Sequence, residues 1–466
     1  MTRNVADILA VVGATIIDGN GGKPIEEGVV LIKGGRLLAV GDKSTIVPPV
    51  AQVISAAGKY VIPGLMDANV HLLVDVRLEN LARHLGHYED LIAEAAQVAL
   101  KSGLTTVFDS WGPRRFLISV RDRINAGTLQ GSRIFCAGNI VGFDGPLSED
   151  FQAKDAQVAS ASFTERINAI WVENVGRHLM WLTPERVAEE VRAYIAKGVD
   201  FIKYASNDHS PGAFLAFSPR TQCAIVEEAH RAGLTAQAHT TSVEGLRIAI
   251  EAGCDLIQHA NITGPTAIPD TTLEMMVRRK TSAVVFPLSQ ERLELFNSKA
   301  DAMARCVWSA TDTNARNLIR CGASVLMAFD SGIHAPEPTS DPFHDWAMLG
   351  QSHFEWFKAM EEKGCAPMAI LKAATRNIAV AYGKDRDLGT LEPGKIADLV
   401  ILDKDPLRGA ENYRSIYQVI KDGVVIDRNT LPVNPILTKP MEPPCTEQAA
   451  YIPFSRSGQF PMCMCR

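Results

Sequence analysis

Two stretches of the sequence, "AGLTAQAHT" at residues 232–240 and "AGCDLIQHA" at residues 252–260, share the pattern that decides the fold. In each stretch, a glycine suits the left-handed backbone position just past the end of a helix. A short apolar run then follows, as expected for a buried strand, and it ends in a histidine. The same pattern returns in three further stretches: "SGLTTVFDS" (102–110), "KGVDFIKYA" (197–205) and "CGASVLMAFDS" (321–331).

Segments with helical spacing precede these strands. "EDLIAEAAQVALK" (89–101) is one. "TPERVAEEVRAYIA" (183–196) is another, with Thr183 as the expected N-cap and Pro184 suited to the first turn. Helix and strand that alternate in this way over about 300 residues predict an α/β fold with a parallel sheet. Both a closed (β/α)8 barrel and an open, doubly wound sheet fit this alternation.

The position of the polar residues favours the closed (β/α)8 barrel of TIM type. Asp109, Lys203, His239, His259 and Asp330 each lie at or near the C-terminal end of a predicted strand. Barrel active sites assemble at that end of the strands, whereas an open sheet gathers its ligands at one switch point. In addition, no Gly-rich phosphate loop follows the first predicted strand.

The two ends of the chain differ from its middle, because they show short strands separated by Gly-rich turns. The N-terminal run "ILAVVGATII" (8–17) is interpreted as a buried strand, since "DGNGG" follows it instead of a signal cleavage site. We predict that residues 1–63 and 385–430 form one small β-sandwich domain beside a barrel of residues 64–384. The Pro-rich, polar residues 431–466 are expected to form an extended C-terminal tail.

Bulk properties exclude several classes of protein. The formal net charge of −6 indicates neither a nucleic-acid nor an anionic-membrane partner. No apolar run of 18 residues would span a bilayer. The nine cysteines lack the spacing of a metal-binding or disulfide framework, which favours a reducing cytoplasm. The pair Cys463 and Cys465 suits either a soft-metal or redox site, or incidental thiols at a chain end.

The strand ends together predict a cationic-metal site. A single buried histidine is more often a core residue than a ligand, and Asp109 fits equally well as an ion-pair partner of Lys203. Imidazoles, a carboxylate and a lysine at one barrel mouth are more specific. A desolvated Lys203 amine can react with carbon dioxide to give a carbamate, which is an oxygen ligand. Nitrogen and oxygen donors without thiolate suit zinc, cobalt, manganese or iron.

Five motifs carry a resemblance to a known family: "VIPGLMDANVHL", "FIKYAS", "AQAHT" with "IQHAN", "AFDSG" and "LGTLEPGKIADLVILDKDPL". Through these motifs the sequence resembles the amidohydrolase superfamily over nearly its whole length. The resemblance implies that Lys203 is a carboxylated metal ligand and that His239 and His259 are metal ligands. It also implies that Asp330 binds metal and moves a proton, and that His71 is the second histidine of a His-x-His pair.

Asn69 departs from the superfamily pattern, because it stands where the first histidine of the pair is expected. A neutral amide is a poor replacement for imidazole, so we expect one divalent metal per chain instead of two. Cobalt or zinc is expected first and manganese after them, with N6-carboxylysine at Lys203. An Asn-x-His motif at this place is similar to a subgroup that includes the phenylurea hydrolases and molinate hydrolase.

The resemblance implies a metal-dependent hydrolase that uses metal-activated hydroxide. Its reaction would be cleavage of an amide, urea or carbamate C–N bond, or of a thiocarbamate C–S bond, in a small and fairly apolar substrate such as a herbicide. Asp330 is expected to transfer the proton, and His71 or Asn69 to donate a hydrogen bond to the oxyanion. We expect a homo-oligomer with a small-molecule substrate and no nucleic-acid or membrane partner.

The substrate pocket is expected to form from the loops after the strands. His209, His334, Trp111 and Phe217 are the candidate substrate-binding residues. Further aromatic residues suit a pocket wall equally well as ordinary packing: Trp171, Trp181, Phe214 and Phe286.

Two other functions fit the same sequence. A metallo-dipeptidase or aminoacylase would need a cation for the substrate carboxylate, for which Arg220 and Lys154 are candidates. A non-catalytic binding protein on this scaffold would have Asn69 as the first of several lost ligands. The retained Lys203, His239 and Asp330 argue against that second alternative.

Overall fold

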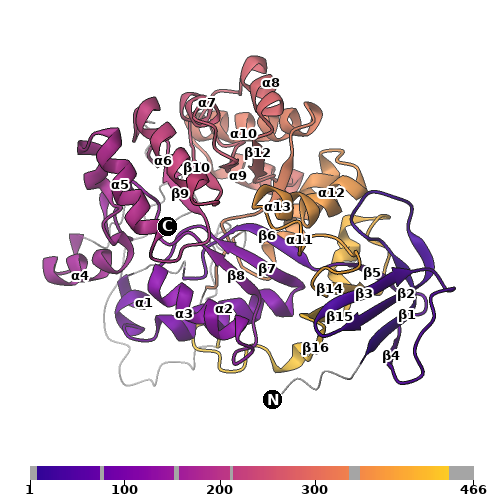
Figure 1. Ribbon diagram of the computed structural model, residues 1–466. Coiled ribbons are helices and arrows are strands. Elements are labelled where there is room, and N and C mark those ends of the chain that lie inside the picture. The colour runs from indigo at the N-terminus through magenta and orange to yellow at the C-terminus, as the bar shows by residue number, and fades with distance from the viewer. Residues whose placement is uncertain (1–7, 74–77, 152–156, 210–213, 335–346, 440–466) are drawn as a thin grey trace, which may run out of the picture.

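A ring of parallel strands forms the centre of the molecule. The computed structural model describes residues 8–73, 78–151, 157–209, 214–334 and 347–439 (Figure 1). Three parallel strands form one sheet in the order β6-β7-β8, and five form another in the order β13-β12-β11-β10-β9. These strands are β6 (Leu65–Val70), β7 (Leu104–Asp109), β8 (Arg133–Cys136), β9 (Ile202–Ala205), β10 (Ala236–His239), β11 (Leu256–Gln258), β12 (Ser282–Val285) and β13 (Val325–Met327).

Two parallel bridges link these sheets to each other. Val141, just after β8, pairs with Tyr204 on β9, and Val70 on β6 pairs with Ser331, just after β13. The eight strands therefore follow one another around a ring in chain order, which places all their carboxyl ends on one side. The strands are buried along their length except for Phe135 on β8, as expected for strands covered on both faces.

Helices surround this ring, and their ends follow local sequence signals. The side chain of Thr183 accepts a hydrogen bond from the Arg186 N–H, with Pro184 in the first turn, as predicted. The glycines at 103, 198, 233, 253 and 322 all have positive φ, which confirms the predicted left-handed positions. The helices are α1 (Leu78–Arg83), α2 (Tyr88–Lys101), α3 (Arg114–Asn125), α4 (Ala161–Val172), α5 (Pro184–Ile195), α6 (Pro219–Arg231), α7 (Val243–Glu251), α8 (Asp270–Arg279), α9 (Gln290–Lys299), α10 (Ala302–Arg320), α11 (Ser352–Glu362), α12 (Pro367–Ala373) and α13 (Arg376–Ala381).

Strands from both ends of the chain pair in a flanking sheet. Its order is β16-β15-β14-β5-β1-β2-β3, and β4 pairs with β1. The antiparallel pairing of β5 with β14 joins Pro63 to Leu399 and so connects the two ends. The strands are β1 (Leu9–Ile16), β2 (Ile25–Lys33), β3 (Arg36–Gly41), β4 (Gln52–Ser55), β5 (Tyr60–Pro63), β14 (Leu399–Leu402), β15 (Ile416–Lys421) and β16 (Val424–Ile426).

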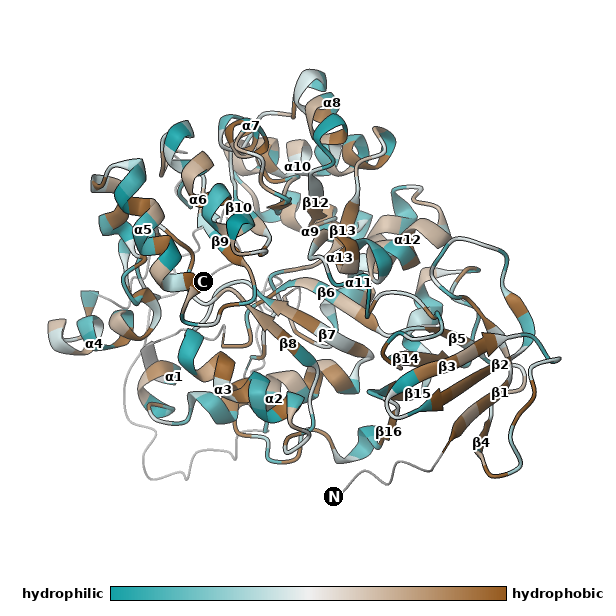
Figure 2. Ribbon diagram, viewed as in Figure 1, coloured by the Kyte–Doolittle hydropathy of each residue, from teal (hydrophilic) through white to brown (hydrophobic). Residues whose placement is uncertain are grey.

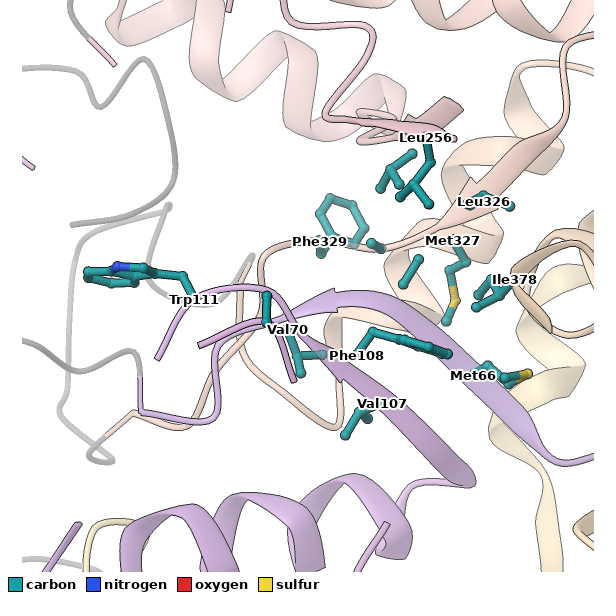
Figure 3. Close-up of a cluster of buried hydrophobic side chains, with 14 of the residues drawn as sticks. Met66, Val70, Val107, Phe108, Trp111, Leu256, Leu326, Met327, Phe329 and Ile378 are labelled. Carbon is teal, nitrogen blue, oxygen red and sulfur yellow. The ribbon is translucent and has the colours of Figure 1, made fainter. Parts of the chain in front are cut away.

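Hydrophobic residues lie along the strands of both sheets, and hydrophilic residues are frequent on the surrounding helices (Figure 2). A core of buried side chains lies between the strands of the ring, among them Met66, Phe108 and Met327 (Figure 3). The ring of Phe108 stacks on Tyr382 with 3.7 Å between centroids. Among the described residues, no helix has the length and apolar character needed to cross a membrane.

A buried ion-pair network joins the ring to the flanking sheet. Arg133 on β8 donates from Nη1 to Asp398 and from Nη2 to Asp422, and its side chain is only 10% exposed. Asp398 also accepts a hydrogen bond of 2.8 Å from the Asp422 N–H. Because Asp398 precedes β14 and Asp422 follows β15, one guanidinium holds two turns of the flanking sheet against β8.

The segment that follows the flanking sheet, residues 431–438, lies along α2, and we call it the C-terminal strap. The carboxylate of Glu94 accepts hydrogen bonds from the N–H groups of Ile436, Leu437 and Thr438 at 2.8–2.9 Å. At the other end of the strap, Nζ of Lys101 donates to the Leu431 carbonyl at 2.8 Å. This part of the predicted extended tail is therefore fixed to α2.

Candidate active site

The predicted polar residues converge at the carboxyl ends of the ring strands. Lys203 lies on β9 and His239 ends β10, while His259 and Asp330 follow β11 and β13. Asn69 lies on β6 and His71 directly after it. All six side chains are buried, with residue exposures of 0–1%. The parallel strands thus bring together residues that are more than 250 positions apart in the sequence.

The histidine that ends β10 lies beside the histidine that follows β11. Nε2 of His259 lies 3.0 Å from Nδ1 of His239, and the ring centroids are 4.6 Å apart. Burial lowers the pKa of His259 to about 4, and the negative charge of Asp330 opposes this shift. Both imidazoles are therefore neutral at neutral pH, which is the state in which histidine binds a metal.

Asp330 is held by the two polar residues at the end of β6. Nδ2 of Asn69 donates to Oδ1 of Asp330, and Nε2 of His71 lies 3.3 Å from the same oxygen. Burial alone would raise the pKa of Asp330, but the hydrogen bond and charge of His71, with the charge of Lys203, lower it to about 2. Asp330 is also in the left-handed region, with φ of +51°, a strained conformation that is common at functional sites.

Lys203 lies at the electrostatic centre of this group. Burial is the largest influence on the pKa values of the surrounding acids and imidazoles. The positive charge of Lys203 is a further, smaller cause of their shifts. Within the described residues, no ion pair joins Lys203 to Asp109 or Asp330. The affected groups are Asp109, Asp330, His71, His209, His239 and His259.

Asp109 binds backbone groups on the same side of the ring. Its carboxylate accepts hydrogen bonds from the N–H of Leu72 at 2.7 Å and from the N–H of Trp111 at 3.2 Å. Burial raises the pKa of Asp109 to about 8, although these hydrogen bonds and Lys203 oppose the shift. The observed contacts give Asp109 a role in holding the turns after β6 and β7.

Trp111 forms one side of an aromatic wall around the site. Its ring meets His71 edge-on with 5.8 Å between centroids and stacks on Phe151 at 4.2 Å. Its indole Nε1 donates to Asn139 at 3.2 Å, which fixes the ring orientation. Trp111 is labelled in Figure 3, beyond Val70 at the end of the core.

His209 continues the wall toward the metal-ligand candidates. Its ring centroid lies 5.0 Å from Phe151, 4.8 Å from Phe143 and 4.2 Å from His239. Its Nδ1 lies 3.0 Å from the Asp150 carbonyl oxygen, whereas its buried Nε2 has no hydrogen-bond partner. Burial lowers the pKa of His209 to about 3, so the ring is neutral.

The other predicted pocket residues differ in their positions. Phe286 lies edge-on to His259 with 5.7 Å between centroids. Phe217 is buried and packs so closely on Gly142 that a β-carbon there would lie 2.5 Å from its ring. His334, which is partly buried, follows Asp330 in the chain. Trp171 is buried, and its ring centroid lies 6.2 Å from that of Trp111.

Several predicted candidates do not lie in this buried group. Trp181 and Phe214 are 88% and 72% exposed. Arg220, the candidate anchor for a peptide carboxylate, is exposed on α6 and pairs with Glu185 at 3.5 Å. Lys154, Cys463 and Cys465 lie outside the described residues.

Sequence reasoning missed the aromatic residues of the loop after β8. Phe143 lies edge-on to His239 at 5.4 Å, and Phe151 bridges Trp111 and His209. Both stand in "VGFDGPLSEDF", the loop that follows a ring strand. The sequence signal that could have identified both residues is their position just after a predicted strand, because the loops at the carboxyl ends of barrel strands line the active site.

The donors present fit a divalent metal, provided that Lys203 takes part. Among the described residues, no three His, Cys, Asp or Glu side chains lie close enough together to hold a metal on their own. The imidazoles of His239 and His259 and the Asp330 carboxylate form a nitrogen and oxygen set, and Nε2 of His239 is buried without a hydrogen-bond partner. Such donors suit zinc, cobalt or manganese.

Comparison with known proteins gives matches along most of the chain. The profile of the amidohydrolase family matches residues 60–426. A solved structure of molinate hydrolase is 36% identical, with a TM-score of 0.89 over 97% of this chain and 99% of that chain. Phenylurea hydrolase B is also 36% identical, with a TM-score of 0.87 over 93% of this chain and 99% of that chain. Ochratoxinase of Aspergillus niger is 24% identical over 418 residues, which cover 86% of this chain and 82% of the relative.

Proposed function

The chain belongs to the amidohydrolase family and is a hydrolytic enzyme, and from this premise we propose that it cleaves a urea, carbamate or thiocarbamate. The substrate is a small, fairly apolar molecule, of the kind found among phenylurea and thiocarbamate herbicides. The 36% identity to molinate hydrolase and to phenylurea hydrolase B over more than nine-tenths of the chain supports this substrate class.

One observation carries the proposal: Asn69 and His71 both contact the single carboxylate of Asp330. The strand-one position is therefore an intact part of the site although it lacks one imidazole. This geometry supports an altered metal centre and argues against a scaffold that has lost its chemistry.

We assign one divalent metal, cobalt or zinc, to His239, His259, Asp330, His71 and a carboxylated Lys203. A metal held there lowers the pKa of water and polarises the substrate carbonyl. The amine of Lys203 is buried beside these residues, and its reaction with carbon dioxide would give the carbamate that serves as an oxygen ligand.

The residues of this chain would then perform hydrolysis as follows. The oxygen of water bonds to the carbonyl carbon, and Asp330, which is ionised, accepts the proton of that water. The bond from carbon to nitrogen or sulfur breaks, and Asp330 returns the proton to the leaving atom. Asn69 keeps Asp330 oriented through its amide N–H, and His71 would donate a hydrogen bond to the oxyanion. Trp111 and Phe151 form an apolar wall that excludes water.

The same proposal includes the architecture around the site. The ring of residues 64–384 is the TIM-type barrel, and residues 1–63 with 385–430 form the β-sandwich domain. We also propose that the protein is cytoplasmic and that it forms a homo-oligomer. Light scattering on the purified protein tests the oligomeric state.

An activity screen tests the proposed reaction. Cobalt-loaded and zinc-loaded protein would be assayed with phenylureas, thiocarbamates, simple amides and Xaa-Pro dipeptides. We expect turnover of a urea or thiocarbamate and none of the dipeptides, because Arg220, the candidate anchor for a peptide carboxylate, is exposed on α6 and pairs with Glu185. Preferred turnover of dipeptides would overturn the proposal in favour of a peptidase.

A further inference from the structure

One ring nitrogen of His209 has no hydrogen-bond partner within the protein. The side chain is 6% exposed, and its Nε2 is buried without a hydrogen-bond partner. A buried polar atom without a hydrogen-bond partner destabilises the folded protein, because it has lost its hydrogen bond to water. Such an atom beside an active site therefore points to a group that arrives from outside the chain.

The other nitrogen of the ring defines which tautomer is present. Nδ1 lies 3.0 Å from the carbonyl oxygen of Asp150, and a carbonyl oxygen only accepts hydrogen bonds. Nδ1 therefore carries the hydrogen. The ring is packed between Phe143 and Phe151, and such an apolar environment disfavours the doubly protonated, charged form. Nε2 consequently presents a lone pair.

The carbonyl that selects this tautomer is itself held in place. The side chain of Asp150 accepts a hydrogen bond of 2.8 Å from the Asp144 N–H and lies 3.5 Å from Nη1 of Arg177. Asp150 is 6% exposed. The loop after β8 thus fixes both the orientation and the protonation of His209, which belongs to the loop after β9.

The lone pair lies within the catalytic group. The centroid of the His209 ring is 4.2 Å from that of His239, and the aromatic wall connects it to Trp111 and His71 on the opposite side.

We propose that Nε2 of His209 accepts a hydrogen bond from a substrate N–H beside the scissile carbonyl. This inference rests on the proposed function and narrows its substrate class. The enzyme selects ureas, carbamates or amides that carry an N–H and discriminates against fully substituted analogues and tertiary thiocarbamates. His209 is then a specificity-determining residue and not a metal ligand.

The activity test compares two substrates in two proteins. The substrates are 1,1-dimethyl-3-phenylurea, which has one N–H, and phenyl N,N-dimethylcarbamate, in which oxygen replaces that N–H. The proteins are the wild type and His209→Phe, which keeps an aromatic ring but removes the lone pair. We expect the ratio of kcat/KM for urea over carbamate to fall about 10- to 100-fold in His209→Phe, because a buried N–H would lose its acceptor. The ratio cancels the different intrinsic reactivities of the substrates.

Metal content and a matched variant separate specificity from structure. His209→Phe should bind as much metal as the wild type, and a loss of metal would mean that His209 is a ligand and would overturn the inference. His353 is an equally buried histidine with one ring nitrogen 3.2 Å from a backbone carbonyl, that of Ser102, away from the site. His353→Phe should leave the substrate ratio unchanged, and an equal fall in both variants would contradict a specific role of His209.

A spectroscopic measurement tests the inference even if neither substrate is hydrolysed. In zinc-loaded protein labelled with ¹⁵N-histidine, the signals absent from His209→Phe, or from His209→Leu if the first variant does not fold, belong to His209. We expect a protonated Nδ1 and an unprotonated Nε2 whose signal shifts on addition of 1,1-dimethyl-3-phenylurea. Turnover of neither substrate by the wild type would count against the proposed function alone. The opposite tautomer, or an Nε2 signal that the urea leaves unchanged, would overturn the role of His209.

Discussion

At the scale of single residues, Lys203 is the side chain on which metal binding depends. It is 1% exposed, and no group of three acids, histidines or cysteines among the described residues can hold a metal without it. We predict that Lys203→Ala loses the metal. Loss of a side chain that only hydrogen-bonds to a metal ligand lowers activity by about 10- to 100-fold, and the activity of Lys203→Ala should fall by more than this. Acetate or propionate should restore part of both, because a carboxylate can replace the carbamate oxygens. Metal analysis and assays with and without these acids check the prediction.

A second buried lysine provides the control for this experiment. The side chain of Lys363 is 2% exposed, and it pairs with Asp312 at 2.5 Å and donates to the Leu288 carbonyl at 2.6 Å. Lys363→Ala should lower stability but keep the metal, and acetate should have no effect on its activity. Equal metal loss in both variants would mean that Lys203 has only a structural role.

Asn69 decides the number of metals. Its amide N–H already contacts Asp330, and its Oδ1 has no hydrogen-bond partner, so an imidazole there would face the same carboxylate. We predict that the wild type holds about one metal per chain and that Asn69→His holds about two, because imidazole is a much better donor than a neutral amide. Metal quantitation after cobalt or zinc reconstitution measures this change.

Asn69→Ala is the matched control, because it removes the amide without adding a donor. It should keep about one metal per chain and lose activity as Asp330 becomes less well oriented. A folded Asn69→His protein that still binds one metal would show that residue 69 lies away from the metal.

The residues that sequence reasoning identified and those that it missed differ in a physical way. Lys203, His239 and Asp330 end strands, so their place follows from a local repeat that every parallel ring must show. Phe143 and Phe151 lie in a loop whose path depends on contacts made across the whole structure. For the same reason, the sequence did not distinguish the buried His209 from the exposed Trp181.

At the scale of elements, β8 is fixed to the flanking sheet by Arg133. The guanidinium is the shared partner of Asp398 and Asp422. Removing one member of a buried ion pair leaves an unpaired charge and costs about 3–5 kcal/mol. We therefore predict that Arg133→Met lowers the free energy of unfolding by about that amount, measured by urea denaturation followed by circular dichroism.

An exposed ion pair of the flanking sheet is the control for Arg133. Lys43 pairs with Glu27 at 2.8 Å, but their side chains are 75% and 68% exposed. Exposed pairs are screened by solvent and contribute little to stability, so Lys43→Met should have little effect. Similar losses in the two variants would mean that the Arg133 network stabilises the fold no more than a surface contact does.

At the scale of the whole molecule, the C-terminal strap holds residues 431–438 against α2, more than 300 positions earlier in the sequence. Glu94→Ala removes the acceptor of three backbone N–H groups at residues 436–438. We predict a loss of about 1–3 kcal/mol, together with faster hydrogen exchange of those amides. Glu89→Ala is the control on the same helix, since Glu89 is half exposed and its nearest cation, Arg123, is 3.9 Å away. Unchanged exchange at 436–438 in Glu94→Ala would show that other contacts hold the strap.

The arrangement of strands and helices along the whole chain could be predicted from the sequence, whereas the individual side-chain contacts between distant segments could not. Alternating helix and strand signals indicated the parallel strands, and the β-rich ends indicated a shared sheet, which the pairing of β5 with β14 shows. The Arg133 network and the Glu94 contacts were not predictable. Each joins residues hundreds of positions apart through single side chains, and such contacts leave no periodic trace in a sequence.

The pairing of β5 with β14 has a consequence for biosynthesis. β1 to β5 leave the ribosome early, but β14, which covers the free edge of β5, is translated only after the strands of the ring. Until then the nascent chain exposes an unpaired, hydrophobic strand edge, the feature through which incomplete chains associate with one another. The edge of β5 is therefore accessible to chaperones until β14 has been translated.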